Sequence, residues 1–161
     1  MTIAIDPTAR ISSLADIEDG PHRIVIGANS VVDSFVKIES AGASGDLVIG
    51  AHVVINSGCV ITAGNGMTIG SNTAIAANCV FSAIRPAYAE KDRLIRDQHF
   101  QPSRGGIIIE EDVWIGAGCI ILEGAILRRG CVIAAASLVD NEVPAYSVQG
   151  GNPLRLLGWR K

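Results

Sequence analysis

The stretch IEEDVWIGAGCIILEGAILRRGCVIAAASLV, residues 109–139, repeats itself every six residues. Each hexad begins with a large aliphatic residue, and a small or β-branched residue follows four positions later. A helix with 3.6 residues per turn cannot keep one face apolar on a strict count of six, and glycine recurs between the aliphatic positions. The pattern therefore predicts a short strand and a turn in every hexad. The aliphatic positions are Ile109, Ile115, Ile121, Leu127, Ile133 and Val139.

The same count of six extends over most of the chain, which makes it an internal repeat. Sets of three hexads, or 18 residues, begin at positions 5, 26, 49, 69, 109 and 127. The distances between these starts exceed 18 by 3, 5, 2, 22 and 0 residues, so the first four sets carry insertions. We therefore expect about six stacked coils, with one long interruption that runs from about residue 83 to 106.

Composition narrows the functional class. The 161 residues suffice for one domain with a substantial core. The net charge of −3, from 13 basic and 16 acidic residues, argues against a nucleic-acid partner. No run of about 18 apolar residues and no signal-peptide pattern is present, so we expect a cytoplasmic protein without an integral membrane segment.

The segment VWIGAGCIILEGAIL (113–127), followed by CVIAAASLVDNEVP and GNPLRLL, resembles the C-terminal half of hexapeptide-repeat acyltransferases. The resemblance covers nearly the whole chain. It implies an all-β fold, a left-handed parallel β-helix of about six triangular coils with one long inserted loop and a short C-terminal capping helix. It also implies a homotrimer with sites between subunits, acetyl-CoA as co-substrate and no metal. Within the family, the chain is similar to sugar O-acetyltransferases.

Domain boundaries follow from the repeat and from the C-terminal sequence. Residues 1–151 are predicted to form the β-helix domain with the inserted loop 83–106, and residues 152–161 the C-terminal cap. Asn152 as N-cap and Pro153 as the first helical residue favour a helix that ends at Gly158. In the resembling enzymes a basic residue of this segment also meets the phosphates of coenzyme A, and Arg155 falls at that place.

The four cysteines do not form a metal-binding pattern. Each occupies the small position of a hexad, and none belongs to a CxxC pair. We interpret them as buried small hydrophobic residues in a reducing compartment rather than as nucleophiles or disulfides. They are Cys59, Cys79, Cys119 and Cys131.

The catalytic base is an open question in this sequence. Transfer of an acyl group from a thioester to a hydroxyl or amine needs a base and a donor for the developing oxyanion. The resembling enzymes place a histidine just after the strand that enters the loop, but the matching stretch here reads SAIRP (82–86). His99, in the loop segment IRDQHF, is the preferred base because histidine titrates near neutrality. His52, or a loop carboxylate such as Glu90 or Asp97, is an alternative; a surface histidine without a role remains an equal interpretation of His99.

Two sets of binding residues follow from the resemblance. Asn56 and Arg85 are predicted to bind the acceptor, although an asparagine at a coil corner also suits a purely structural role. The donor groove is expected along the coils that contain the quoted stretch, with Arg155 at its end. Its predicted residues are Trp114, Gly116, Ala117, Ala135, Ala136, Ser137 and Arg155.

Three functions remain in competition. The leading hypothesis is an acyl-CoA-dependent transferase that acetylates a hydroxyl or amino group of a sugar or other small acceptor, in surface polysaccharide or lipopolysaccharide synthesis. A metalloenzyme similar to γ-carbonic anhydrases needs three converging histidines, and His22, His52 and His99 are scattered in the sequence. A trimeric scaffold that has lost its base is the third, because SAIRP lacks histidine.

Overall fold

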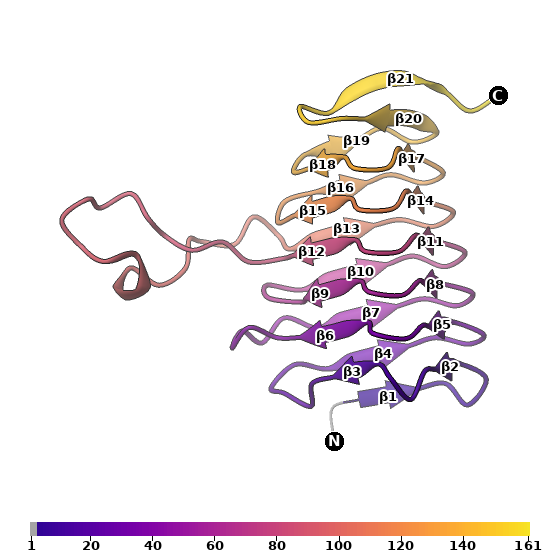
Figure 1. Ribbon diagram of the computed structural model, residues 1–161, viewed down its shortest axis with the longest axis horizontal. Coiled ribbons are helices and arrows are strands. Elements are labelled where there is room, and N and C mark those ends of the chain that lie inside the picture. Colours follow the sequence, from indigo (N-terminus) through magenta and orange to yellow (C-terminus); the bar gives the residue numbers. More distant parts are fainter. Residues whose placement is uncertain (1–2) are drawn as a thin grey trace.

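The computed structural model describes residues 3–161, which form a tall solenoid with a long arm projecting from its side (Figure 1). Three parallel sheets make its walls, and each complete coil contributes one strand to each sheet. Six complete coils are followed by a seventh of two strands, one turn more than the predicted six. The all-β prediction is confirmed. A single turn of 3₁₀-helix, η1 (Ile95–Asp97), lies in the arm.

The strands of the three sheets stack in strict sequence order. Sheet A contains β1 (Ile3–Ile5), β4 (Ile24–Ile26), β7 (Leu47–Ile49), β10 (Met67–Ile69), β13 (Ile107–Ile109), β16 (Ile126–Leu127) and β19 (Glu142–Val143). Sheet B contains β2 (Arg10–Ile11), β5 (Val31–Val32), β8 (Val54–Ile55), β11 (Ala74–Ile75), β14 (Trp114–Ile115), β17 (Val132–Ile133), β20 (Ser147–Gly150) and β21 (Arg155–Trp159). Sheet C contains β3 (Asp16–Ile17), β6 (Lys37–Glu39), β9 (Val60–Thr62), β12 (Val80–Ser82), β15 (Ile120–Leu122) and β18 (Leu138–Val139).

The six-residue count locates the core correctly. From the second coil onward the aliphatic positions of the hexads are buried, from Ile26 to Val139. The positions four residues later are buried too, except where they fall in the connections 40–46, 63–66 and 83–106. The first coil departs from this rule, because its lower side has no coil beneath it among the described residues and Ile5 is 42% exposed. Burial of aliphatic side chains stacked coil upon coil is therefore what holds the solenoid together.

Two of the three corners of the solenoid turn in a uniform way. In each complete coil, four residues join sheet A to sheet B and four join sheet B to sheet C, as in 50–53 and 116–119. From the second coil onward the third residue of these turns lies in the left-handed region of backbone space, for example His52 with φ 56° and Ala136 with φ 58°. A left-handed residue reverses the chain tightly enough to start the next strand in register.

All the long connections lie at the third corner, between sheet C and sheet A. Within residues 3–161 the segments 18–23, 40–46, 63–66 and 83–106 connect these two sheets, and they correspond to the four insertions counted in the sequence. Segment 83–106 is the inserted loop and is called the arm below. We call the three edges of the solenoid the A–B, B–C and C–A corners.

The predicted C-terminal helix is wrong. Residues 155–159 form β21, which runs antiparallel to β20, and Leu154 packs partly buried against the end of the core. A helix of one or two turns pays the cost of nucleation for few hydrogen bonds. The open edge of β20 instead offers backbone partners to an extended chain, so the cap is a strand.

Candidate functional site

Five of the predicted donor residues lie in the B–C turns 116–119 and 134–137, and Trp114 and Arg155 lie on the adjoining sheet B; we call the seven residues together the column. Trp114 of β14 pairs with Ala74 below and Val132 above, and its side chain is 53% exposed on the outer face of sheet B. Two residues later, Gly116 lies against the turn of the next coil. The column therefore spans successive coils, which parallel strands space about 4.8 Å apart.

Gly116 permits the close approach of these two turns. A Cβ atom at this position would come within 2.5 Å of the Ala135 backbone nitrogen. The exposed neighbours Ala117 and Ala136 are joined by a backbone hydrogen bond, in which the Ala136 N–H donates to the Ala117 carbonyl at 2.9 Å. The result is a smooth strip of backbone and methyl groups, onto which an elongated ligand can lie closely.

Ser137 does not present its hydroxyl to solvent. It is buried, its Oγ donates to the Ala134 carbonyl at 2.6 Å, and it accepts the Gly151 N–H at 2.8 Å. Both interactions hold the corner together. The contribution of Ser137 to a donor site is therefore the position of the backbone around it.

A ladder of thiols braces the same corner from inside. Cys59, Cys79 and Cys119 each donate to a carbonyl of the next coil at 3.1–3.2 Å, those of Ala76, Gly116 and Ala134. The predicted burial of all four cysteines is confirmed. Burial also raises the pKa of the Cys131 thiol to about 12, so that it stays protonated at neutral pH.

Arg155 lies at the C-terminal end of the column, on β21 instead of a helix. It pairs with Gly150 of β20, and Gly150 in turn lies close to Ala134 of the coil below. The side chain of Arg155 is exposed and forms no ion pair with any residue in the described range 3–161. A cation at the end of the column is therefore available to an anionic ligand.

Asn56 lies on the same corner as Gly116, two coils nearer the N-terminus. Its side-chain amide donates to the Ile75 carbonyl at 2.8 Å, and its backbone N–H donates to the same oxygen at 3.0 Å. One of the two amide hydrogens of Asn56 is thus engaged by the solenoid. The side-chain oxygen and the second amide hydrogen are the parts of Asn56 that can meet an acceptor.

The arm stands away from the coils and carries His99. Its two limbs are joined by backbone hydrogen bonds from Ala87 N–H to the His99 carbonyl, at 2.9 Å, and from Gln101 N–H to the Arg85 carbonyl, at 2.8 Å. The side chain of Gln98 closes the tip by donating to the carbonyls of Glu90 and Arg93. The His99 side chain is exposed, and its backbone is left-handed with φ 61°.

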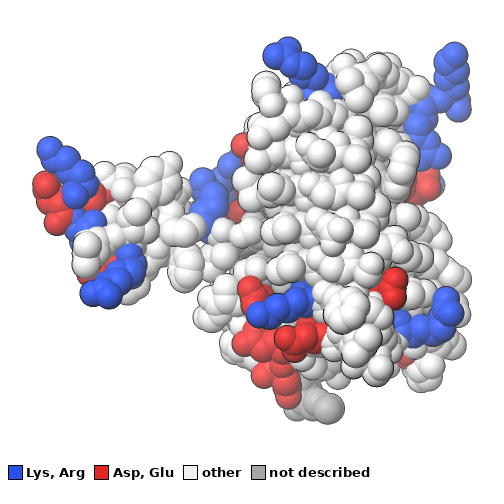
Figure 2. Space-filling model, in the orientation of Figure 1, with Lys and Arg blue, Asp and Glu red and all other residues white. Residues whose placement is uncertain are grey.

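The surface of the arm differs from that of the coils. The coil face in Figure 2 is largely free of charged side chains over the upper part, whereas the tip of the arm carries both signs of charge. Large apolar side chains are also exposed on the arm, which is unusual for a segment in contact with water alone. They are Tyr88, Leu94, Ile95 and Phe100, each more than half exposed.

The arm and the donor column belong to different corners of one chain. The arm leaves the solenoid at the C–A corner, after β12, while the column follows the B–C corner. His99 and Trp114 therefore do not come together within a single chain (Figure 1).

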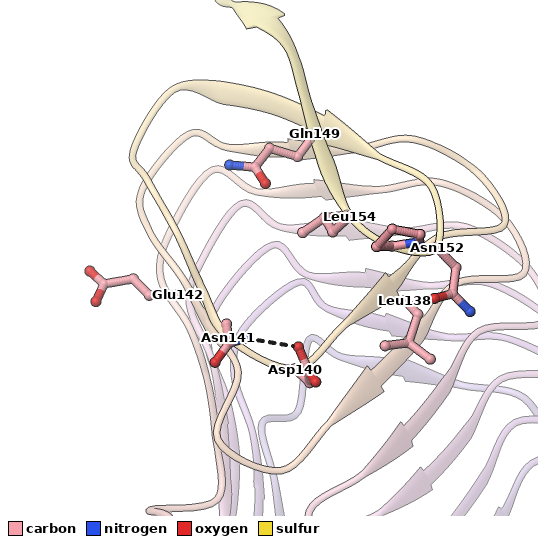
Figure 3. Close-up of a pocket in the computed structure, with 8 residues that line it drawn as sticks. Leu138, Asp140, Asn141, Glu142, Gln149, Asn152 and Leu154 are labelled. Carbon is pink, nitrogen blue, oxygen red and sulfur yellow. Dashed lines mark hydrogen bonds between the residues drawn. The ribbon is translucent and has the colours of Figure 1, made fainter.

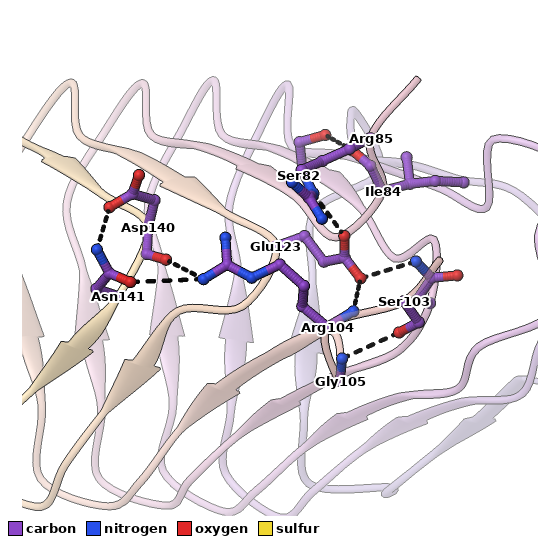
Figure 4. A network of polar contacts seen from close by, with 10 residues as sticks. Ser82, Ile84, Arg85, Ser103, Arg104, Gly105, Glu123, Asp140 and Asn141 are labelled. Atoms are coloured by element: carbon purple, nitrogen blue, oxygen red, sulfur yellow. Dashed lines mark hydrogen bonds and ion pairs between the residues drawn. The ribbon is translucent and has the colours of Figure 1, made fainter. Parts of the chain in front are cut away.

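The base of the arm contains a buried carboxylate that the sequence did not single out. Glu123 has no exposed surface, and it accepts hydrogen bonds from Asn65 Nδ2 at 2.9 Å, Arg85 Nε at 3.1 Å and the Arg104 backbone N–H at 2.7 Å (Figure 4). Arg85 is thus ion-paired at the root of the arm. The sequence does contain a feature that could have pointed to Glu123, since it is the one acidic residue between Asp112 and Asp140.

The charge state of Glu123 follows from these partners. Burial by itself raises the pKa of the Glu123 carboxyl, but hydrogen bonds from Arg104 N–H, Asn65, Arg85 and Ser103 outweigh it and hold the pKa below its ordinary value. The carboxylate is therefore ionised at neutral pH and strongly hydrogen-bonded.

A cavity of about 330 Å³ lies at the C-terminal end of the solenoid (Figure 3). It mixes carboxylate and amide groups with apolar side chains, and the sequence analysis did not predict it. Asp140 and Asn141 lie side by side on its wall. The lining residues are Leu138, Asp140, Asn141, Glu142, Gln149, Asn152, Pro153 and Leu154.

The other two histidines occupy structural positions. His52 is exposed at the left-handed position of an A–B corner. His22 is buried in the connection 18–23, and neither ring nitrogen has a hydrogen-bond partner among the described atoms. Over residues 3–161, no three His, Cys, Asp or Glu side chains come together as a possible metal site, and no helix is long and apolar enough to cross a membrane.

Comparison with known proteins identifies the repeat. Residues 106–141 match the family described as bacterial transferase hexapeptide (six repeats). A 2,3,4,5-tetrahydropyridine-2,6-dicarboxylate N-acetyltransferase of Staphylococcus aureus (strain JH9) is 43% identical over 56 residues, which cover 35% of this chain and 23% of that protein. The chain thus matches less than a quarter of the length of these curated relatives.

Solved structures share the solenoid over almost the full chain. AntD, an N-acyltransferase from Bacillus cereus in complex with dTDP and 3-hydroxybutyryl-CoA, has a TM-score of 0.81 at 20% identity, covering 99% of this chain and 83% of AntD. A maltose O-acetyltransferase from Clostridium difficile 630 has a TM-score of 0.68 at 20% identity, covering 99% and 71%. At this identity the likeness is one of fold. Residues 106–141 therefore match the bacterial transferase hexapeptide family, and the whole solenoid shares its fold with acyltransferases of known structure.

Proposed function

We propose that this protein transfers an acyl group, acetyl in the simplest case, from acyl-CoA to a hydroxyl or amino group of a sugar-type acceptor. The observation that carries the proposal is the column at the B–C corner. Its small residues, the exposed Trp114 and the cation Arg155 follow one another along successive coils within and beyond the segment that matches the family. Similar solenoids bind coenzyme A in AntD.

The reaction is a direct displacement. The acceptor oxygen or nitrogen attacks the thioester carbonyl, a C–O or C–N bond forms, the C–S bond breaks and coenzyme A leaves. A base removes the acceptor proton, and a backbone N–H near the corner stabilises the oxyanion. We assign the base to His99, with Glu90 or Asp97 of the arm and His52 as alternatives. Ser137 and Gly116 hold the backbone that faces the donor.

The site is completed between subunits in this proposal. The arm and the column lie at different corners of one chain, and the arm exposes apolar side chains that favour burial against a partner. We therefore propose a homotrimer in which the arm of one subunit brings His99 towards the column of its neighbour. Asn56 and Arg85 border the acceptor in this arrangement.

The acceptor class is inferred from the relatives. AntD has been solved with dTDP-4-amino-4,6-dideoxyglucose and coenzyme A, and another structural relative is a maltose O-acetyltransferase. A sugar of surface polysaccharide or lipopolysaccharide synthesis fits both. We place the reaction in the cytoplasm, where acyl-CoA is made and buried cysteines stay reduced.

Calorimetric titration with acetyl-CoA tests this function first. We expect wild-type protein to bind, and Arg155→Ala to bind about tenfold more weakly because one charge-assisted phosphate contact is lost. Arg129→Ala is the matched control, since it removes the same charge at the A–B corner, where Arg129 pairs with Glu111. A binding protein would then be screened with amino and hydroxyl sugars, with His99→Ala as the test of the base.

A non-catalytic scaffold is the alternative function. It is favoured by the stretch SAIRP, in which no histidine follows β12. Absence of acetyl-CoA binding at millimolar ligand would overturn the transferase proposal. Binding without turnover on any acceptor would support the scaffold.

A further inference from the structure

We propose that Glu123 is a positioning residue: its carboxylate clamps both ends of the arm to the solenoid and so sets where the arm delivers its side chains. The inference rests on the proposed function for its catalytic consequence. Its structural part concerns the arm alone and is testable without any substrate.

The first argument is the position of Glu123 at a junction of four segments. Glu123 belongs to the turn 123–125 of the C–A corner, directly above the point where the arm begins and ends. Arg85 is the third residue of the arm and Arg104 the third from its end, and both donate to this one carboxylate. Asn65 adds the connection of the coil below.

The second argument is burial. The Glu123 side chain has no exposed surface, whereas its ion-pair partner Arg85 is one-third exposed. A buried carboxylate is retained at a cost in desolvation and needs all its lone pairs occupied. Here two limbs of one loop supply the donors. Removal of the Glu123 charge is therefore expected to loosen both limbs of the arm at their root, which is a larger change than the loss of one contact on the surface.

The third argument is that the returning limb is held again one layer higher. The guanidinium of Arg104 lies over Gly124, with Cζ 2.7 Å from where a Cβ would be, and its Nη2 donates to the Asp140 carbonyl at 3.3 Å. Below, Gly106 lies against the Gly66 carbonyl. Ala83 and Ile84 are buried at the root of the outgoing limb, and the Asn65 N–H donates to the Ala83 carbonyl at 2.8 Å, so both limbs are packed where they join the coils. The contact from Arg85 to Glu123 is the last tie of the outgoing limb to the coils before the arm projects.

Beyond Arg85, the arm has few other ties to the coils. The hydrogen bonds from Ala87 to His99 and from Gln101 to Arg85 join one limb of the arm to the other and not to the coils. The two limbs can therefore move together as one unit. A rotation of the arm about its root would displace His99, because the hydrogen bonds between Ala87 and His99 and between Gln101 and Arg85 make His99 part of the same two-limbed unit. The contacts that fix the root of the arm therefore also fix the position of His99.

The test compares Glu123→Gln with Glu142→Gln by hydrogen–deuterium exchange at neutral pH. Glutamine keeps the shape and one acceptor oxygen but loses the charge. Glu142 is an exposed glutamate whose carboxylate pairs with Arg128 away from the arm, so it controls for loss of one charge. We expect arm amides of Glu123→Gln to exchange about tenfold faster, while amides of β9, β14 and β17 keep wild-type rates.

A second variant guards against misfolding of the first. Arg85→Gln removes the other partner at a one-third exposed position, and we expect the same increase in the arm. The double variant is expected to add nothing further, because the two single changes break one interaction. Unchanged arm exchange in both single variants, or equal acceleration in arm and coils, would overturn the clamp.

Kinetics separate the clamp from the proposed function. We expect the Kd for acetyl-CoA in Glu123→Gln to stay within about twofold of wild type, since the column is untouched, while kcat falls or the acceptor KM rises about tenfold or more. If wild-type protein does not bind acetyl-CoA, the proposed function fails and the exchange result still decides the clamp. A loose arm with wild-type kcat and KM would overturn its role in positioning.

Discussion

At the B–C corner every complete coil turns through four residues, whereas connections at the C–A corner run from two residues (140–141) to 24 (83–106). The first corner is built from small residues, close backbone approach and buried thiols. The second is built from loops of unequal length, of which the connection 63–66 and both limbs of the arm meet at Glu123. One six-residue repeat therefore supports one corner whose turns keep a constant length and another corner whose connections differ in length.

The difference follows from where the neighbouring coil lies. At the B–C corner each turn is hydrogen-bonded to the turn of the next coil. A Cβ added at Gly116 would displace that next turn, whereas one at Gly118 would meet no described atom within 4 Å. At the C–A corner some turns point into solvent. No described atom lies within 4 Å of the site of a Cβ at Gly42. A ligand surface and an adjustable arm can thus coexist on one scaffold.

The largest expected effect is that of Gly116→Val. Its Cβ would come within 2.5 Å of backbone in the next coil, and we expect the free energy of unfolding to fall by about 3 kcal/mol. Gly158→Val is the control, because no described atom lies near a Cβ there and its backbone φ is not left-handed. Urea unfolding of both measures the contrast; equal losses would refute the account of this corner.

An insertion at each corner sharpens the comparison. We expect Gly-Ser-Gly after Ala117 to cost about 2–3 kcal/mol, because it breaks the Ala136–Ala117 and Gly118–Ala77 backbone hydrogen bonds. The same insertion after Gly42 is expected to cost below about 1 kcal/mol, because loop-closure entropy rises only slowly with loop length. Thermal unfolding and acetyl-CoA titration of both proteins measure this. A stable protein with the insertion after Ala117 would contradict it.

Ser137→Ala probes the corner with a smaller change. We expect a loss of about 1–2 kcal/mol, because the Ala134 carbonyl and the Gly151 N–H lose a buried partner. Ser57→Ala at the same corner, where no side-chain hydrogen bond ties the hydroxyl to the described residues, is expected to be close to neutral. Chemical unfolding of the two variants gives the comparison, and equal effects would show that the hydroxyl is dispensable.

The smallest effect is the pH dependence of the stability that Glu123 contributes at the C–A corner, which is expected only at acidic pH. The folded-state pKa of Glu123 lies below its ordinary value of 4.5, so its stabilisation is complete above pH 4.5 and is lost as pH falls through the folded pKa. The difference in stability between wild type and Glu123→Gln should therefore narrow on acidification. Unfolding midpoints from pH 7 down to pH 3 test this, and a constant difference would exclude the charge as its origin.

The sequence determined the core and left the corners partly open. A strict count of six predicts which residues are buried because inward positions depend on the period alone, as Ile55, Ile75 and Ile115 show. The same count does not tell at which corner an insertion lies. The segment LRLLG (154–158) is compatible with a helix by its local sequence. The unpaired edge of β20 offers it backbone hydrogen bonds, however, and the chain forms the strand β21 instead.

The candidate site divides in the same way. Trp114, Gly116 and Ala135 lie together because a repeat places equal positions above one another. The partners of Glu123 are separated from it by up to 58 positions, and they meet only because loops of different length converge at one corner. Such contacts depend on three-dimensional packing, so the ion pair between Glu123 and Arg85 did not follow from the sequence. The exposure of His99 agrees with one of the two interpretations that the sequence left open.

The orientation of β21 also limits what the protein can assemble into. Stacked parallel coils could in principle accept another solenoid end to end, since each coil is a template for the next. β21 runs in the opposite direction, and an antiparallel edge spaces its hydrogen-bonding groups differently from the parallel strands below. A second molecule that approached β21 would therefore meet a mismatched edge on sheet B, which disfavours growth of a polymer through this edge.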